Sequence, residues 1–365
     1  MRLSYRSVAH TLSEPLRIAR ATFSTAYAVE VAVSLHGLEG FGEATPIPRY
    51  GESVDSACTF FDEVRRLLGD DPFALEEIEG RVAEIPGQLA AKAALDAALH
   101  DLCGKLTGEP VWRLLGMPRT GRESSRTVWL DDPDEMARRA ERLGGFSRVK
   151  LKLGGRDGID VERVRAVRAA TALPLTVDVN EGWTLDEALE TVPRLVGLGV
   201  EHVEQPLPAG DPGGPQLKRA SPLPIFVDED CCTLADVLHC AERAHGINVK
   251  LAKSGGIREA IRMVHAARAL DLGVMVGCMV ESSLAVAAAC CVAPLCDVVD
   301  LDGNLLLADD PWIGVSLEDG IVAPSRQPGL GVTRLRPVPR NIRGRLRRRA
   351  RRVWRSLPQT GRTAG

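Results

Sequence analysis

The sequence lacks several features that would assign it to a familiar structural class. None of its 365 residues belong to an apolar run of about 18 residues, the length that a membrane-spanning helix needs. The N-terminus has no apolar signal-peptide core. The nine cysteines include no CxxC pair, and the seven histidines show neither HxxxH nor HExxH spacing. A disulfide framework and a zinc site are therefore disfavoured, and we expect a cytoplasmic protein with buried, reduced cysteines.

Acidic residues and lysine are missing from residues 334–365, which contain twelve arginines. Subtracting these twelve from the 46 basic residues leaves 34 against 49 acidic ones, so residues 1–333 carry a net charge of −15. Residues 1–333, with this acidic net charge, are not expected to bind nucleic acid. We expect the tail, 334–365, to be a disordered extension. A basic amphipathic helix in weak contact with an anionic surface is the alternative.

The chain shows two successive hydrophobic patterns. Residues 1–118 begin with alternating apolar and polar positions, as in Val29–Leu35, and continue with apolar residues at helical spacing, as in Ala91–Leu102. Strands followed by helices predict a small α+β domain.

Residues 119–333 instead alternate short β-branched runs with helix-like stretches. The runs are Thr127–Leu130, Val149–Leu153, Leu175–Val179, Val200–Val203, Pro224–Val227, Ile247–Leu251, Gly273–Val276 and Val298–Leu301. Eight such strands predict an α/β fold, a (β/α)7β-type TIM barrel. A doubly wound open sheet is the alternative, but no GxGxxG follows a strand to favour it.

Charged residues stand at the ends of these expected strands. The series is Lys150 and Lys152, Asp178, Glu204, Asp228 and Glu229, Lys250 and Lys253, and Asp300 and Asp302. From Lys152 to Lys250 the steps are 22 to 26 residues, which is one β/α unit each. The side chains should therefore ring the C-terminal mouth of the barrel, where barrel enzymes carry out catalysis.

The residue types in this ring indicate a chemistry. Three carboxylates at one point repel one another unless they share a cation, and ligation by oxygen alone selects a hard ion, so Asp178, Glu204 and Asp228 are expected to hold Mg²⁺. Asn180 and Glu229 would support them. Lys150 and Lys152 are two positions apart and so face the same side of their strand. With a lysine on each side of the metal, a proton can leave one face of a substrate and return to the other.

The strand-end motifs KLK, DVN, EQP, DED and KLAKSGG resemble those of the enolase superfamily, in its muconate-lactonizing subgroup. Asp300-Leu301-Asp302 is similar to the element that binds the substrate ammonium group in dipeptide epimerases of the L-Ala-D/L-Glu type. The likeness covers about residues 3–333 and implies that residues 1–118 form a capping domain, to which the end of the barrel domain returns.

The resemblance also implies roles. It suggests an Mg²⁺-dependent isomerase that epimerises the α-carbon of the C-terminal residue of a dipeptide by 1,1-proton transfer through an enediolate. Lys152 and Lys250 would be the acid/base catalysts, and Asp178, Glu204 and Asp228 the metal ligands. The implied substrate contacts are Thr127, Lys150, Asp300 and Asp302, together with Arg20 in a mobile loop of the cap.

Other readings stay open at this point. A cycloisomerase or o-succinylbenzoate synthase would keep the same fold. A non-catalytic protein docked to a membrane or to nucleic acid by its basic tail is a second alternative. The segment Val280–Leu284 has no basic residue to hold a glutamate side chain, so dipeptides other than L-Ala-L-Glu are open. A homo-oligomer is compatible with each of the three interpretations: the epimerase, the alternative enzymes of the same fold and the non-catalytic docked protein.

Overall fold

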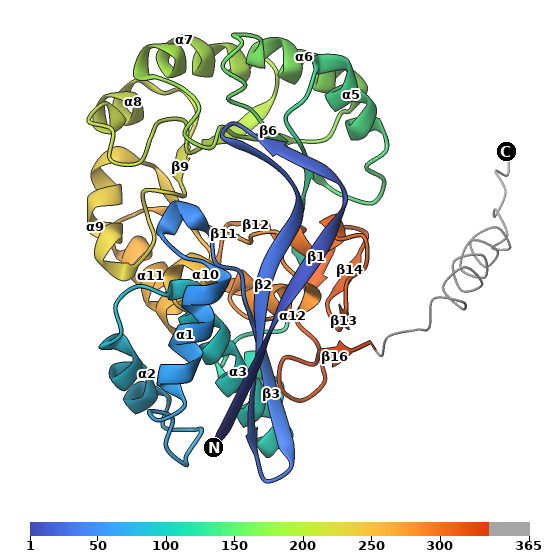
Figure 1. Cartoon of the computed structure of the whole chain (residues 1–365). Coiled ribbons are helices and arrows are strands. Elements are labelled where there is room, and N and C mark those ends of the chain that lie inside the picture. Colours follow the sequence, from blue (N-terminus) through green and yellow to red (C-terminus); the bar gives the residue numbers. More distant parts are fainter. Residues whose placement is uncertain (336–365) are drawn as a thin grey trace, which may run out of the picture. The chain divides into compact units, whose positions relative to one another are not determined.

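The structure, a computed structural model, describes residues 1–335, of which Met1–Thr333 form one compact unit (Figure 1). The arginine-rich tail predicted to be disordered lies, from residue 336 onward, outside the described residues. Among residues 1–335, no helix is both long enough and apolar enough to cross a membrane.

An antiparallel sheet opens the chain, in the order β1-β2-β3. Its strands are β1(Arg2–Ile18), β2(Ala21–Leu35) and β3(Leu38–Ala44), followed by η1(Pro48–Tyr50), α1(Val54–Val64), α2(Leu75–Ala83), α3(Leu89–Thr107) and α4(Val111–Leu114). The alanine-rich α3 packs closely on β3, because a Cβ at Gly40 or Gly42 would overlap backbone atoms of that helix. The strands β1 and β2 form a long hairpin (Figure 1). Near its tip, the Arg17 carbonyl accepts from the Leu130 amide of the second domain at 3.1 Å.

Eight parallel strands form the second sheet, ordered β12 to β5. They are β5(Ser125–Val128), β6(Arg148–Lys152), β7(Leu175–Asp178), β8(Val200–Glu204), β9(Ile225–Val227), β10(Gly246–Val249), β11(Gly273–Gly277) and β12(Val298–Asp300). Ser124 closes the barrel: it pairs with Val299, and its hydroxyl accepts from the Leu301 amide at 2.9 Å. The predicted α/β barrel with an N-terminal α+β domain is thus confirmed, and its first strand begins two residues earlier than predicted.

Helices separate the barrel strands. They are α5(Pro133–Glu141), α6(Asp160–Ala170), α7(Leu185–Val196), α8(Gly214–Ala220), α9(Leu234–Arg243), α11(Ile257–Ala269) and α12(Ser283–Cys290). Val149 and Leu151 of β6 pack into the apolar core with α5 and α6, so the alternating Lys150 and Lys152 face the barrel interior. One extra helix, α10(Leu251–Ser254), begins one residue after β10, so the strand predicted over 247–251 ends two residues earlier than expected and Lys253 is helical.

Short elements complete the described chain: β4(Arg122–Glu123), η2(Ala293–Leu295), η3(Gly303–Leu306), β13(Trp312–Ile313), β14(Ser316–Glu318), β15(Ile321–Ala323) and β16(Thr333–Arg334). The boundary predicted after residue 118 falls between α4 and β4 and stays a prediction.

Asp101 of α3 joins the first domain to the end of the barrel domain. Its fully buried carboxylate accepts from the Phe41 amide at 2.9 Å, the Leu330 amide at 2.7 Å and Lys105 Nζ at 2.7 Å. We expect Asp101→Ala to lower the free energy of unfolding by about 3 kcal/mol, because two buried amides and an ammonium lose their acceptor. Urea denaturation measures the change.

A matched control is Glu190→Ala, which removes an exposed carboxylate 3.6 Å from Arg194 on α7. That exposed pair should contribute at most about 1 kcal/mol. Equal losses in the two variants would show that Asp101 does not hold the segments together.

Candidate active site

The register of the parallel strands brings charged side chains together at the barrel mouth. Lys152 of β6 lies opposite Asp178 of β7, which lies opposite Glu204 of β8. Asp228 follows β9 directly and Lys250 follows β10 directly. The carboxylates of Asp178 and Glu204 are fully buried, and that of Asp228 nearly so. Because an unpaired charge is costly to bury, these groups need partners.

Lysines from β6 supply part of that compensation. Lys152 Nζ lies 2.6 Å from Asp178 Oδ2. Lys150 Nζ lies between three carboxylates, at 2.6 Å from Asp300, 2.7 Å from Glu204 and 3.2 Å from Asp178. The expectation that both lysines point into the mouth agrees with these contacts.

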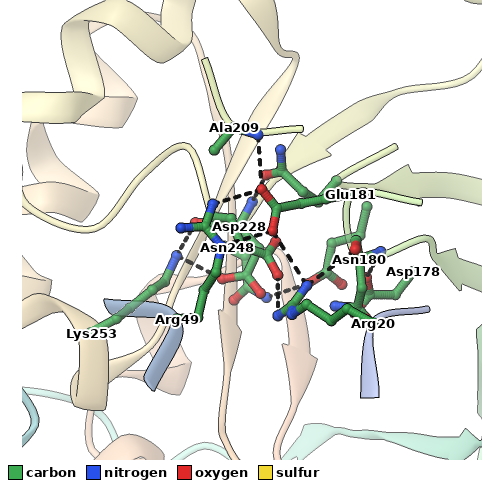
Figure 2. Close-up of polar contacts among 12 residues, drawn as sticks. Arg20, Arg49, Asp178, Asn180, Glu181, Ala209, Asp228, Asn248 and Lys253 are labelled. Carbon is green, nitrogen blue, oxygen red and sulfur yellow. Dashed lines mark hydrogen bonds and ion pairs between the residues drawn. The ribbon is translucent and has the colours of Figure 1, made fainter. Parts of the chain in front are cut away.

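Two further lysines hold Asp228. Lys250 Nζ lies 2.7 Å from its Oδ2. Lys253 Nζ lies 2.8 Å from its Oδ1 (Figure 2). Lys253 also donates to the Cys231 carbonyl at 2.6 Å. The sequence marks Lys253 as a strand-end lysine without giving it a role, and its place on α10 is what turns it toward Asp228.

The pKa values follow these pairings. Burial lowers the pKa of Lys250, but the carboxylates of Asp228 and Glu204 raise it more strongly, so it lies above the ordinary lysine value. Burial raises the pKa of Asp228, yet Lys250 and Lys253 bring it well below the usual range. Glu204 differs, because burial and the neighbouring Asp178 raise its pKa despite Lys150.

The carboxylates can be compared with what Mg²⁺ requires. Over residues 1–335, no three carboxylate, imidazole or thiol groups already surround one point as metal ligands do. The ammonium groups of Lys150, Lys152 and Lys250 lie against them instead. The donor set nevertheless suits a hard divalent ion, because it offers only oxygen. Burial raises the pKa of Glu204, and the negative charges of Asp178 and Asp228 raise it further. A cation shared by the three would relieve that repulsion.

Polar groups behind the carboxylates orient them. Asn248 Nδ2 donates to Glu204 Oε1 at 2.7 Å, and the Asn180 amide donates to Asp178 Oδ1 at 3.0 Å. Gln205 Oε1 accepts from the Asp228 amide at 2.8 Å. Asn180 was expected to support the carboxylates and does so through its backbone. Asn248 and Gln205 were missed, although Asn248 stands two positions before Lys250, on the same strand face.

Asp300 and Asp302 lie on the side of the mouth closed by β12. Asp300 contacts Lys150, and its other oxygen, Oδ1, is buried and has no hydrogen-bond partner among the described residues. Asp302 accepts from the Thr127 amide at 2.8 Å, from the Thr127 hydroxyl at 3.3 Å and from Arg126 at 3.2 Å. Arg126 was missed, because its place on β5 gives no sign of an acidic neighbour 176 residues away.

A cavity of about 110 Å³ occupies the mouth. Most of the predicted site residues line it: Arg20, Thr127, Lys150, Lys152, Asp228, Lys250, Asp300 and Asp302. Asp178 and Glu204 do not line it, but both contact Lys150. Arg20, at the tip of the β1–β2 hairpin, is 2.7 Å from Glu229, so Glu229 supports the hairpin and not a neighbouring carboxylate.

A barrel under an α+β domain, with lysines and carboxylates at its strand ends, defines a known class. Residues 2–116 match the mandelate racemase/muconate lactonizing enzyme N-terminal domain, and residues 134–336 match the enolase C-terminal domain-like family. The chain therefore belongs to the enolase superfamily.

Among curated relatives, the chain is 40% identical over 322 residues to the L-Ala-D/L-Glu epimerase of Bacteroides thetaiotaomicron, covering 86% of this chain and 84% of that protein. Among solved structures, it is similar to a substrate-liganded L-Ala-D/L-Glu epimerase from Bacillus subtilis, with a TM-score of 0.88, 31% identity and coverage of 92% and 99%. A dipeptide epimerase from Enterococcus faecalis with Mg and L-Leu-L-Tyr gives a TM-score of 0.87 at 30% identity, with coverage of 91% and 99%.

Proposed function

We propose that this chain is an Mg²⁺-dependent dipeptide epimerase that moves a proton from one face of the substrate α-carbon to the other. The observation that carries the proposal is the placement of Lys152 and Lys250. They stand at β6 and β10, four strands apart in an eight-stranded barrel, and so face each other across the mouth. One lysine removes the proton and the other returns one, which inverts the α-carbon of the dipeptide's C-terminal residue.

Asp178, Glu204 and Asp228 would hold the Mg²⁺. When bound, the ion stabilises the negative charge that develops on the substrate carboxylate as the α-proton leaves. Lys150, which contacts two of these carboxylates and Asp300, would add positive charge beside the substrate carboxylate. Lys152 and Lys250 keep short contacts to Asp178 and Asp228, which fix their ammonium groups at the cavity wall.

Asp300 and Asp302 would bind the substrate ammonium group. The unpartnered Oδ1 of Asp300 lacks a donor, and an ammonium supplies one. Thr127 would act through Asp302, whose carboxylate it holds with two hydrogen bonds. A cycloisomerase or o-succinylbenzoate synthase acts on a substrate that has no ammonium to offer, so these acidic residues favour the epimerase. Arg20 as a substrate contact stays a prediction.

The test is incubation of a library of L,L-dipeptides with the protein and Mg²⁺ in D₂O. We expect one α-proton to be replaced by deuterium in a subset of the library, and the D-epimer to accumulate at the C-terminal residue. Mass spectrometry measures the deuterium incorporation, and NMR measures the accumulation of the D-epimer. Lys218→Ala, outside the mouth on α8, is the control variant and should exchange normally.

Exchange in no dipeptide would contradict the proposal. Conversion of muconate or a succinylbenzoate precursor by an Asp302→Asn variant would instead support the alternative reaction. Binding to nucleic acid or anionic vesicles without any Mg²⁺-dependent activity would support the non-catalytic reading.

We propose that the enzyme acts in the cytoplasm, because all nine cysteine thiols are free. A homo-oligomer and weak contact of the arginine tail with an anionic surface stay predictions. The described contacts of residues 1–335 bear on neither.

A further inference from the structure

We infer that the dipeptide carries uncharged, apolar side chains, and that Arg20 anchors the hairpin over the mouth in place of binding an acidic side chain. This inference rests on the proposed function, since it concerns the substrate of the same cavity. It is carried by the composition of the cavity wall and by the ion pairs of the cationic side chains in it.

The cavity has a continuous apolar wall made from both domains. The β1–β2 hairpin contributes Leu16, Ile18 and Phe23, and the barrel contributes Trp129, Val280 and Leu306. These six side chains belong to one apolar cluster, in which Leu16, Trp129 and Leu306 are buried. Leu306 closes the short helix that follows Asp302, so the wall begins beside the proposed ammonium site. An apolar substrate side chain placed there would be transferred from water to an apolar surface, which is favourable.

Arg20 is the basic residue of the cavity wall that the proposed function does not place at the reacting end of the substrate, and its charge is already balanced. Its guanidinium lies 2.7 Å from Glu229. It also lies 3.5 Å from Glu181 and donates to the Asn180 carbonyl at 3.1 Å (Figure 2). The Glu229 side chain is only 1% exposed. These contacts tie the hairpin tip to the segments after β7 and β9.

Glu181 is the centre of this network. It accepts two hydrogen bonds from Arg49, at 3.0 and 2.7 Å, and one from the Ala209 amide at 2.9 Å (Figure 2). Its backbone is left-handed, with φ of 67°, directly after Asn180 at 48°. Non-glycine residues rarely adopt this conformation, and the two in a row turn the Glu181 carboxylate toward the cap.

The remaining cationic side chains that line the cavity are engaged in the same way. Lys152 pairs with Asp178, Lys250 with Asp228, and Lys150 with Asp300. Every basic side chain that lines the cavity thus has a carboxylate partner in the protein. The proposed function places the three lysines at the α-carboxylate and the α-carbon, which leaves Arg20 as the remaining cation for a side-chain carboxylate.

An acidic side chain at Arg20 would either share the guanidinium with Glu229 and Glu181, and so meet two like charges, or displace Glu229 and leave a buried carboxylate without its counter-ion. A basic side chain would meet the guanidinium of Arg20 itself. Both charges are therefore selected against, whereas an apolar side chain disturbs no ion pair.

The experiment compares kcat/KM for deuterium exchange of L-Ala-L-Val, L-Ala-L-Gln and L-Ala-L-Glu. We expect L-Ala-L-Val to exceed L-Ala-L-Glu by about tenfold or more, with the nearly isosteric L-Ala-L-Gln above L-Ala-L-Glu. A preference for L-Ala-L-Glu would overturn the inference and leave the epimerase proposal standing. If neither these three dipeptides nor any other member of the library exchanged its α-proton, the epimerase proposal itself would be overturned.

Glu181→Gln tests the role of the network. The amide oxygen can still accept from Ala209, while one negative charge beside Arg20 and Arg49 is lost. The ratio of kcat/KM for L-Ala-L-Glu to kcat/KM for L-Ala-L-Gln should rise about fivefold, and it should rise less at high salt. Glu190→Gln, which removes an arginine-paired glutamate from exposed α7, should leave the ratio unchanged. An unchanged ratio in Glu181→Gln would show that Arg20 is not held by this network.

Phe23→Ser tests the wall independently. It should raise KM for L-Leu-L-Leu about tenfold while changing that for L-Ala-L-Ala much less. Phe73→Ser, at a phenylalanine that is 53% exposed and outside this cavity, is the control. Equal effects on both dipeptides would contradict contact between the wall and the substrate side chain.

Discussion

Replacing Lys152 or Lys250 by alanine should abolish epimerisation while leaving exchange on one face of the α-carbon. Each lysine serves one face, so the epimer whose α-hydrogen points to the remaining lysine can still lose and regain it there. The opposite epimer should exchange on the order of 10³-fold more slowly, the range that general acid/base catalysis supplies. The two variants should show opposite stereochemical preferences.

In each of these variants, the aspartate that loses its lysine partner keeps a second one. Without Lys152, Asp178 keeps Lys150 at 3.2 Å, and without Lys250, Asp228 keeps Lys253 at 2.8 Å. Neither variant leaves a buried carboxylate alone, so both should fold. Exchange of each epimer in D₂O, followed by NMR, is the measurement, with Lys218→Ala as control. If a single variant lost exchange from both epimers, or from neither, the two-lysine assignment would be wrong.

The second large effect is expected for Asp228→Asn. Loss of one of three carboxylates should weaken Mg²⁺ binding by about 100-fold or more and reduce epimerisation by about 10³-fold. Calorimetric titration with Mg²⁺ measures the affinity directly. Thermal unfolding gives a second readout, because an ion that binds the folded state raises the Tm of the parent protein but not of the variant.

Asp297→Asn is the matched control. Asp297 precedes β12 and pairs with Arg268 at 2.6 Å, so it is also an ion-paired aspartate, but it does not line the mouth. Its variant should bind Mg²⁺ as the parent does. Parent-like Mg²⁺ affinity in Asp228→Asn would remove Asp228 from the metal site.

The barrel and the residues at its mouth could be predicted from the sequence. Periodicity located all eight strands, because buried parallel strands require short β-branched runs and their helices require a different period. The 22- to 26-residue spacing of Lys152, Asp178, Glu204, Asp228 and Lys250 also sufficed to place these residues together. Each β/α unit returns the chain to the same end of the sheet, so a local repeat carries a tertiary consequence.

The pairing of the charges, by contrast, depends on contacts between segments far apart in the sequence. Arg20 meets Glu229, Arg126 meets Asp302, and Lys150 meets Asp300, across 150 to 209 positions of sequence. Such pairs depend on how the hairpin docks on the barrel and on how β5 meets β12, and no local pattern encodes either. A basic residue in a loop therefore looked available in the sequence, whereas the folded chain had already matched Arg20 with a buried carboxylate.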